Sequence, residues 1–330
     1  MADTTVFNLP GQQNGAGSTE ALFLTMFGGE VMNSFNETNI ARPLVRSISV
    51  GAGKDFQFPR IGKAEATYHD RGRNILEGTD FLQSMEHTAV SIAVDKTLLS
   101  STFVDDWDEA IKHYETRSEY ARQLGSALAR TTDIQLLRMI AKAADGTPFV
   151  DQINTDAMSG STVTLDGTSG LDTIKDGVIK AAVELAKKDV PMADMVVAVS
   201  PDDYYALLED DQLVSADFSS ASNADRGDGK IFKAYGFRIV TTPRLSEAGI
   251  GAGTYAPLAG ENNPYDGDFS QIRALAWHRD AVGSIVRKDV AVETDYRVER
   301  QGTLVVAKML AGHGVLKNEC AVRIVDSRWV

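Results

Sequence analysis

The sequence contains a single cysteine and no long hydrophobic run. Cys320 alone can form neither an intrachain disulfide nor a cysteine metal cluster, so synthesis in a reducing cytoplasm is expected. Nowhere do about 18 apolar residues follow one another, as a membrane-spanning helix would require. Residues 1–10 lack the basic and apolar regions of a secretion signal. We therefore expect no membrane segment and no export signal.

Motifs for catalysis and for cofactor binding are also missing. The five histidines are scattered without zinc-ligand spacing, and no GxSxG elbow occurs. Gly51-Ala52-Gly53-Lys54 resembles part of a phosphate loop, but Ile48 and Asp55 stand where Gly and Ser or Thr are needed. The acidic clusters at 105–109 and 202–203 fall at predicted helix starts, where negative charge is stabilising without a metal. The sequence predicts no enzyme, no cofactor and no metal site.

The charge balance is acidic, with 46 Asp and Glu against 33 Lys and Arg. Binding of nucleic acid over a whole surface depends on Lys and Arg displacing counterions from phosphate, so the net charge of -13 argues against it. With 330 residues, 43% of them hydrophobic, the chain is long enough for one large domain or two ordinary ones.

The first 100 residues predict an arm followed by a long hairpin. Residues 1–20 are rich in Gly, Asn, Gln and Ser and predict a flexible arm, followed by a short helix over 20–35. Residues 51–95 predict an antiparallel excursion, whose return arm alternates Val90, Ile92 and Val94 with smaller or polar residues. Because a two-stranded hairpin is marginally stable alone, we expect it to rest on a neighbouring subunit.

A long amphipathic helix is predicted from Asp105 or Asp106 to Ala144, and Asp145-Gly146-Thr147-Pro148 would end it. Roughly 40 residues give a rod of about 60 Å at a rise of 1.5 Å per residue. A coiled coil is the alternative, but polar residues at Ser118 and at 131–133 interrupt a sustained heptad seam.

The remainder of the chain predicts a compact mixture of helices and strands. A helix over 171–188 precedes a buried strand, and Ser200-Pro201 then opens a further helix. A Gly- and Pro-rich loop over 246–268 is long enough to be functional or an insertion. The predicted strands here are 195–199, 237–240 and 273–277, followed by alternating apolar segments from His278 to Val325.

This order of elements resembles the major capsid proteins of tailed phages, and the local matches are closest to the coat proteins of short-tailed phages. The similarity spans nearly the whole chain and is weakest at the extreme N-terminus and in the 246–268 loop. The matching segments, in chain order, are Leu22–Leu24, Phe27–Val31, Val45–Ser49, Phe58-Pro59, His113-Tyr114, Arg117–Tyr120, Gln123–Gly125, His278-Arg279 and Ala281–Gly283.

The resemblance implies an α+β protein with the Hong Kong 97-like capsid fold. It also implies a function: a major capsid protein that self-assembles into hexamers and pentamers of an icosahedral virion shell around double-stranded DNA. The implied segments are an N-terminal arm (1–50), an extended loop (51–101), the spine helix of the peripheral domain (102–148), an axial domain (149–275) and returning strands of the peripheral domain (276–330).

The implied partners are other copies of the chain, a scaffolding protein and a portal during assembly in the host cytoplasm, and packaged DNA on the inner face. No membrane partner is expected. A flexible arm and a projecting hairpin would supply large repeated interfaces, because they bury area on neighbours. From position alone, the predicted inter-subunit contacts are Phe23, Phe27, Arg46, Phe58, Arg60, Glu115, Arg117 and Glu119.

Two other functions compete with this interpretation. The first keeps the fold and encloses an enzyme in a bacterial nanocompartment of the encapsulin kind, which a neighbouring cargo-enzyme gene would favour. The second is a soluble α/β enzyme, which a monomeric chain in solution would favour. The absence of a nucleophile, base or metal constellation weighs against the enzyme.

Overall fold

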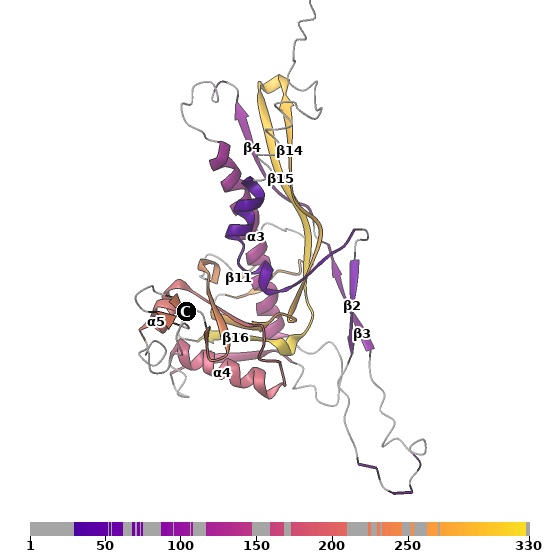
Figure 1. The fold of residues 1–330 in the computed structure, drawn as a ribbon, viewed down its shortest axis with the longest axis vertical. Coiled ribbons are helices and arrows are strands. Elements are labelled where there is room, and N and C mark those ends of the chain that lie inside the picture. The colour runs from indigo at the N-terminus through magenta and orange to yellow at the C-terminus, as the bar shows by residue number, and fades with distance from the viewer. Residues whose placement is uncertain are drawn as a thin grey trace, which may run out of the picture.

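The structure is a computed structural model whose two larger β-sheets are joined by one long helix (Figure 1). It describes residues 30–51, 53, 55–61, 68–69, 71–72, 74, 87–94, 96–105, 107, 117–146, 159–167, 173–209, 224–225, 230–231, 233–245, 252–253, 263–269 and 271–327. The mixture of helices and sheets confirms the α+β class. Among the described helices, none combines the length and the apolar character needed to cross a bilayer.

The first sheet has four strands in the order β1-β14-β15-β4. β14 (Val282–Arg297) and β15 (Gly302–Val315) form a long antiparallel ribbon that turns at the 3-10 helix η5 (Val298–Arg300). β1 (Arg46–Ser49) runs parallel to β14, and β4 (Leu98–Asp105) runs antiparallel to β15. The ribbon makes this sheet the elongated part of the molecule in Figure 1.

The long helix α3 (Arg117–Asp145) covers one face of this sheet and continues into the core of the second. Leu124 and Leu128, in its N-terminal half, pack with Val305 and Met309 of β15. Its C-terminal half contributes buried residues such as Ile140 to the larger core. Its 29 residues correspond to a length of about 44 Å.

Of the two predicted starts of this helix, Asp105 is wrong because it is the last residue of β4, and Asp106 lies outside the described residues. The side chain of Asp105 accepts a hydrogen bond of 2.9 Å from the amide of Trp107, so it has the capping role expected of it, at the end of a strand. Residues 108–116 lie outside the described part of the chain. The predicted end is confirmed, since α3 stops at Asp145 and Gly146 follows.

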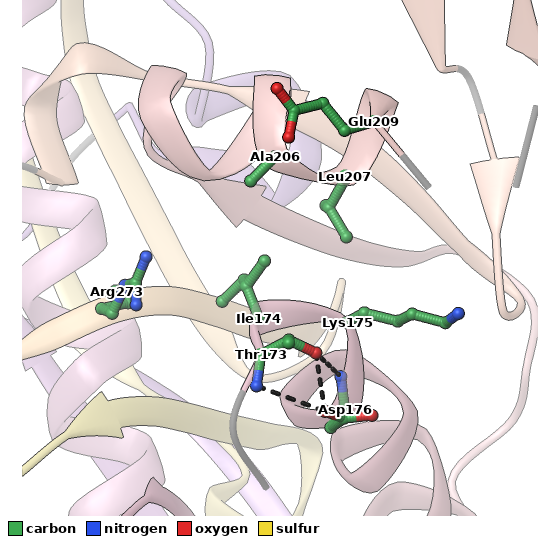
Figure 2. A pocket seen from close by; sticks show the side chains of 8 residues that line it. All are labelled: Thr173, Ile174, Lys175, Asp176, Ala206, Leu207, Glu209 and Arg273. Atoms are coloured by element: carbon green, nitrogen blue, oxygen red, sulfur yellow. Dashed lines mark hydrogen bonds between the residues drawn. The ribbon is translucent and has the colours of Figure 1, made fainter. Parts of the chain in front are cut away.

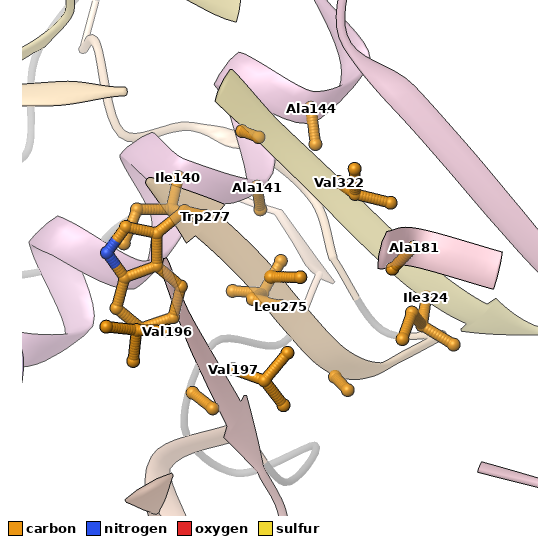
Figure 3. Packing of buried hydrophobic residues seen from close by; sticks show 14 of the residues in the cluster. Ile140, Ala141, Ala144, Ala181, Val196, Val197, Leu275, Trp277, Val322 and Ile324 are labelled. Atoms are coloured by element: carbon orange, nitrogen blue, oxygen red, sulfur yellow. The ribbon is translucent and has the colours of Figure 1, made fainter. Parts of the chain in front are cut away.

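The second sheet has six strands and carries helices α4 (Ile174–Lys187) and α5 (Pro201–Leu208). The predicted cap of α5 is confirmed, since the Ser200 side chain accepts a hydrogen bond from the Asp203 amide. α4 begins at Ile174 rather than at the predicted Leu171, and its capping box of Thr173 and Asp176 is a feature that the sequence analysis missed. Figure 3 shows side chains from α3, α4 and the strands meeting in one apolar core. In sheet order the strands are β5 (Ser161–Leu165), β16 (Ala321–Asp326), β13 (Ile272–His278), β6 (Met195–Val199), β10 (Phe237–Thr241) and β9 (Lys233–Ala234).

The predicted hairpin is present as β2 (Asp55–Ile61) and β3 (His87–Ala93), which pair with each other and stand beside the first sheet (Figure 1). The predicted short helix is confirmed over 30–38. The part of this helix predicted over 20–29, the flexible arm predicted over 1–20 and most of the hairpin tip lie outside the described residues. The minor elements are η1 (Arg42–Leu44), β7 (Ala224–Asp225), β8 (Lys230–Ile231), η3 (Pro243–Leu245), β11 (Ala252–Gly253), β12 (Gly267–Asp268) and η6 (Asn318–Cys320).

Two strands lie elsewhere than the expected segments would put them. β4 joins the first sheet, although its residues were divided between the extended loop and the spine helix. β16 lies between β5 and β13 in the second sheet, although it was grouped with the returning strands of the peripheral domain. In both strands the side chains alternate between a more buried and a less buried face. This alternation identifies a strand, but the strands with which it pairs decide which sheet it joins.

Candidate inter-subunit surfaces

The base of the β2–β3 hairpin is seated on its own chain by an apolar cluster. Phe58 of β2 and Ile92 of β3 are buried together with Ile285 of β14 and Leu316. Phe56 meets the Phe58 ring edge-on at a centroid distance of 4.9 Å. This cluster fixes the direction in which the hairpin leaves the first sheet.

Small residues let the hairpin approach β15 closely. A Cβ atom at Gly312 would collide with the carbonyl oxygen of Ala93, and one at Gly314 would lie 2.6 Å from Ile92 Cγ1. Any larger side chain at Gly312 would have to push the backbone of the hairpin away. We call this contact, formed by Gly312 and Gly314 against Ile92 and Ala93, the hairpin seat.

A buried ion pair completes the anchorage. Arg60 Nη2 lies 2.7 Å from Glu319 Oε2, and Arg60 Nη1 donates to the carbonyl oxygen of Leu316 at 3.1 Å. Only 5% of the Arg60 side chain and 10% of the Glu319 side chain are exposed. Because the Glu319 carboxylate would be buried without this cation if Arg60 moved away, the pair favours one position of the hairpin base.

The segment before β1 is held to α3 by a second buried carboxylate. Asp133 of α3 accepts hydrogen bonds from the amides of Ile40 and Ala41, at 3.1 and 2.9 Å, and pairs with Arg244 at 2.8 Å. Burial raises the pKa of Asp133, while the Ala41 amide, Arg244 and the Ile40 amide oppose that rise. This contact ties the N-terminal segment, the long helix and η3 together.

On the face of the first sheet away from α3, the hairpin covers the end at Gly312 and Gly314, whereas among the described residues the end around Leu99 and Phe103 is exposed. Leu98 faces the α3 core, so the alternating residues Leu99 and Phe103 point to the other side, where they are 59% and 38% exposed. They stand opposite Lys308 and Leu304 of β15 in the strand register. We call the surface formed by Leu99, Phe103 and Leu304 the outer face. Large apolar side chains exposed on one sheet face are typical of an interaction surface.

The predicted contact residues divide into three groups. Phe58 and Arg60 are buried within their own chain, at 7% and 6% exposure, and support the hairpin base. Arg46 is exposed on β1, with Nη1 3.8 Å from Asp280 Oδ1. Glu119 is exposed on α3, where hydrogen bonds from Gln123 and Arg122 lower its pKa.

The remaining predicted contacts cannot be placed. Phe23, Phe27 and Glu115 lie outside the described residues, and for Arg117 only its position in α3 is described. The sequence reading missed Glu319, Asp133 and the two glycines of the hairpin seat. A Gly-His-Gly sequence inside an apolar strand is the signal that indicates a close backbone approach at 312 and 314.

A cavity of about 630 Å³ lies between the start of α4 and α5 (Figure 2). Arg273 at its edge is held by the carboxylates of Asp203 and Asp326, and Thr173 and Asp176 bond each other in the capping box. These polar groups serve the fold. Among the described residues, no three His, Cys, Asp or Glu side chains stand together as metal ligands.

Comparison with known proteins points to one family. The family described as Gp10A-like major capsid protein matches residues 57–325. The major capsid protein of Escherichia phage T7 is 32% identical over 330 residues, which cover 94% of this chain and 93% of that protein. The major capsid protein of Enterobacteria phage T3 is 31% identical over 333 residues, which cover 96% and 94%.

Solved structures with the same arrangement are also capsids. The capsid structure of cyanophage P-SCSP1u covers 88% of both chains with a TM-score of 0.72 and 29% identity. The mature capsid of bacteriophage PhiM1 covers 88% of this chain and 87% of its own, with a TM-score of 0.68 and 18% identity, which supports the fold alone.

Proposed function

Because the chain belongs to the Gp10A-like family of major capsid proteins, we propose that the open surfaces of its Hong Kong 97-like fold are the contacts that close a phage shell. The protein is a structural component of the virion of a tailed double-stranded DNA phage and not an enzyme. A nanocompartment shell is not favoured, because the relatives at 29–32% identity are phage capsid proteins.

The central contact of the proposal joins the hairpin of one copy to the sheet of another. The β2–β3 hairpin of one subunit would lie on the outer face of an adjacent subunit, covering Leu99 and Phe103. The observation that carries this proposal is the combination of a hairpin anchored at its base by Arg60 and Glu319 with exposed apolar side chains, Leu99 and Phe103, at the far end of the same sheet face. A neighbouring copy on this end of the sheet would remove the exposed apolar side chains of Leu99 and Phe103 from water.

We assign the first sheet and α3 to the peripheral domain, and the second sheet with α4 and α5 to the axial domain. Residues 1–50 act as the arm and the hairpin acts as the extended loop. The same chain would form hexamers and pentamers, with the angular difference taken up by the arm and by the hairpin beyond its seat. Arg46 and Glu119 are exposed and stay predicted contacts, as do Phe23, Phe27, Glu115 and Arg117.

The other proposed partners follow from family membership and from charge. A scaffolding protein and a portal would act during assembly in the host cytoplasm, and double-stranded DNA would lie against the inner face. The net charge of -13 supports a lining that does not grip DNA strongly, because such gripping needs an excess of Lys and Arg.

The test is co-expression with a scaffolding protein that assembles the coat protein of its own phage into shells, followed by negative-stain electron microscopy. The wild-type chain should form closed, uniform icosahedral shells. A Leu99→Glu/Phe103→Glu chain should lower shell yield by about tenfold or more, since each 1.4 kcal/mol lost from a contact changes its equilibrium tenfold.

A conservative variant, Leu99→Ile/Phe103→Leu, keeps the outer face apolar and is the matched control. Thermal unfolding of the unassembled chains separates a lost contact from a lost fold. Wild-type chains that stay monomeric or form small oligomers beside the competent scaffold would contradict the proposed function. Normal shells from a folded Glu variant would contradict the role of the outer face.

A further inference from the structure

A group of cations gathers around a small cavity at one end of the second sheet. Tyr235 and Gly236 both have positive φ, 52° and 88°, as the two-residue turn between β9 and β10 requires. This turn sets Lys233 directly opposite Arg238. Arg279, from the turn between β13 and β14, lines the same cavity of about 270 Å³. We call Lys233, Arg238 and Arg279 with this cavity the basic pocket.

Among the described residues that line it, the basic pocket has three cations and one carboxylate. Across the described residues, none of its three cations forms an ion pair or a hydrogen bond. Asp194 also lines the cavity without pairing with them. Like charges directly opposite on antiparallel strands are unfavourable, so the Lys233 and Arg238 pairing indicates that an anion belongs between them. In a chain with 46 acidic and 33 basic side chains, such a cluster stands out.

The lining of the pocket indicates which kind of anion. Pro43, Leu44 and Met192 supply an apolar wall beside the cations. The volume is below the roughly 300–1,000 Å³ of small-molecule sites, so it suits a side chain or two. A mixed wall of this kind matches a peptide segment that carries both carboxylates and apolar groups, whereas a phosphate backbone would leave the apolar wall uncovered.

A segment with this chemistry is exposed elsewhere on the same chain. Asp202, Tyr205 and Glu209 follow the i, i+3, i+7 spacing of one face of α5 and its C-cap, and Tyr205 is 65% exposed. We call these three residues the acidic face of α5. It combines carboxylates with an exposed aromatic ring, which complements the cations and the apolar wall of the basic pocket.

The two surfaces lie at opposite ends of β6. Met195, the first residue of this strand, lines the basic pocket, while α5 follows Val199, the last. At the Val199 end, the last turn of α5 and Arg273 line the same cavity (Figure 2). A five-residue strand spans about 17 Å, so one chain cannot close the contact on itself. Different surfaces at opposite ends generate a head-to-tail contact, which closes into a ring when the rotation allows.

We propose that the basic pocket of one subunit receives the acidic face of α5 from a second copy of this chain, so that axial domains join head to tail around a ring. This inference rests on the proposed function, because it needs copies arranged around a ring.

The test reverses the charges on each side and then on both. With the competent scaffold, Lys233→Glu/Arg238→Glu and Asp202→Lys/Glu209→Lys should each lower the yield of sedimenting shells by about tenfold or more. The chain carrying all four changes should regain most of the wild-type yield, since opposite charges then meet again. Arg130→Glu/Arg300→Glu alters the net charge equally at exposed positions away from the pocket and should leave the yield near wild type.

Thermal unfolding of each unassembled chain identifies variants that fail to fold. If a two-change variant fails to fold, the shell yield of the chain with all four changes tests the contact. If the two-change variants fold but the chain with all four changes does not regain shell yield, the proposal is overturned. Normal shells from Lys233→Glu/Arg238→Glu, together with weaker binding of a double-stranded DNA oligonucleotide, would assign the pocket to phosphate and also overturn it. Wild-type chains that form no shells would overturn the proposed function itself.

Discussion

Removing one partner of the Arg60–Glu319 pair should loosen the hairpin and destabilise the chain. In Arg60→Met, the carboxylate of Glu319 stays in a site where only 10% of the side chain is exposed, and the carbonyl oxygen of Leu316 loses its donor. Breaking a buried pair in this way costs about 3–5 kcal/mol. Urea unfolding of the unassembled chain measures this loss. The substitution should also raise the amide hydrogen-exchange rate, relative to wild type, more in β2 and β3 than in α3.

The double variant Arg60→Met/Glu319→Leu is the matched control, because replacing both charges by apolar groups leaves no buried charge behind. It should lie within about 1–2 kcal/mol of wild type in unfolding free energy. If Arg60→Met alone costs less than about 1 kcal/mol, as exposed pairs do, the pair does not anchor the hairpin base. Equal losses in the single and double variants would also refute the reasoning, since packing would then explain them.

Three further predictions concern residues near the same anchorage. Gly312→Ala should cost about 1–3 kcal/mol in urea unfolding, because its Cβ would collide with Ala93, whereas Gly51→Ala, with nothing within 4 Å, should change little. Burial, and secondarily Arg42, lowers the pKa of His313 to about 3 from 6.5, so its contribution to stability is complete above pH 6.5 and is lost as the pH falls toward 3. The unfolding free energy should therefore fall by about 1.4 kcal/mol per pH unit in this window, and His313→Phe should flatten the slope; equal slopes would contradict this. Burial, and secondarily Glu319, raises the pKa of the Cys320 thiol to about 12, so a disulfide reagent should react only on unfolding, and rapid reaction of the folded chain would count against its burial.

The elements that sequence reasoning predicts best are those with local signals. The Ser200-Pro201 start is such a signal, and α5 begins where it places the helix, whereas α4 begins at Ile174 and not at the predicted Leu171, because the capping box of Thr173 and Asp176 fixes its start. β4 was divided between two other elements because the alternation in Leu98–Asp105 acquires its meaning from pairing with β15, which is distant in the sequence. β16 illustrates the same point, since its neighbours in the sheet are β5 and β13.

The candidate site was predicted less well than the fold, again for a physical reason. Arg60 is a predicted contact from its position alone, and within the chain its charge is paired with Glu319 from η6. Phe58 is buried by Ile285 of β14 and by Leu316, just after β15, which no local pattern connects with it. Inter-subunit contacts depend on surfaces that only a second copy completes, so single-chain patterns contain little of the required information.

Cryo-electron microscopy of wild-type shells tests the central claim most directly. In the reconstruction, the β2–β3 hairpin of each subunit should lie across the four-stranded sheet of an adjacent copy, with Leu99 and Phe103 buried beneath it. A hairpin that contacts only its own subunit, with the outer face still exposed in the closed shell, would contradict the account.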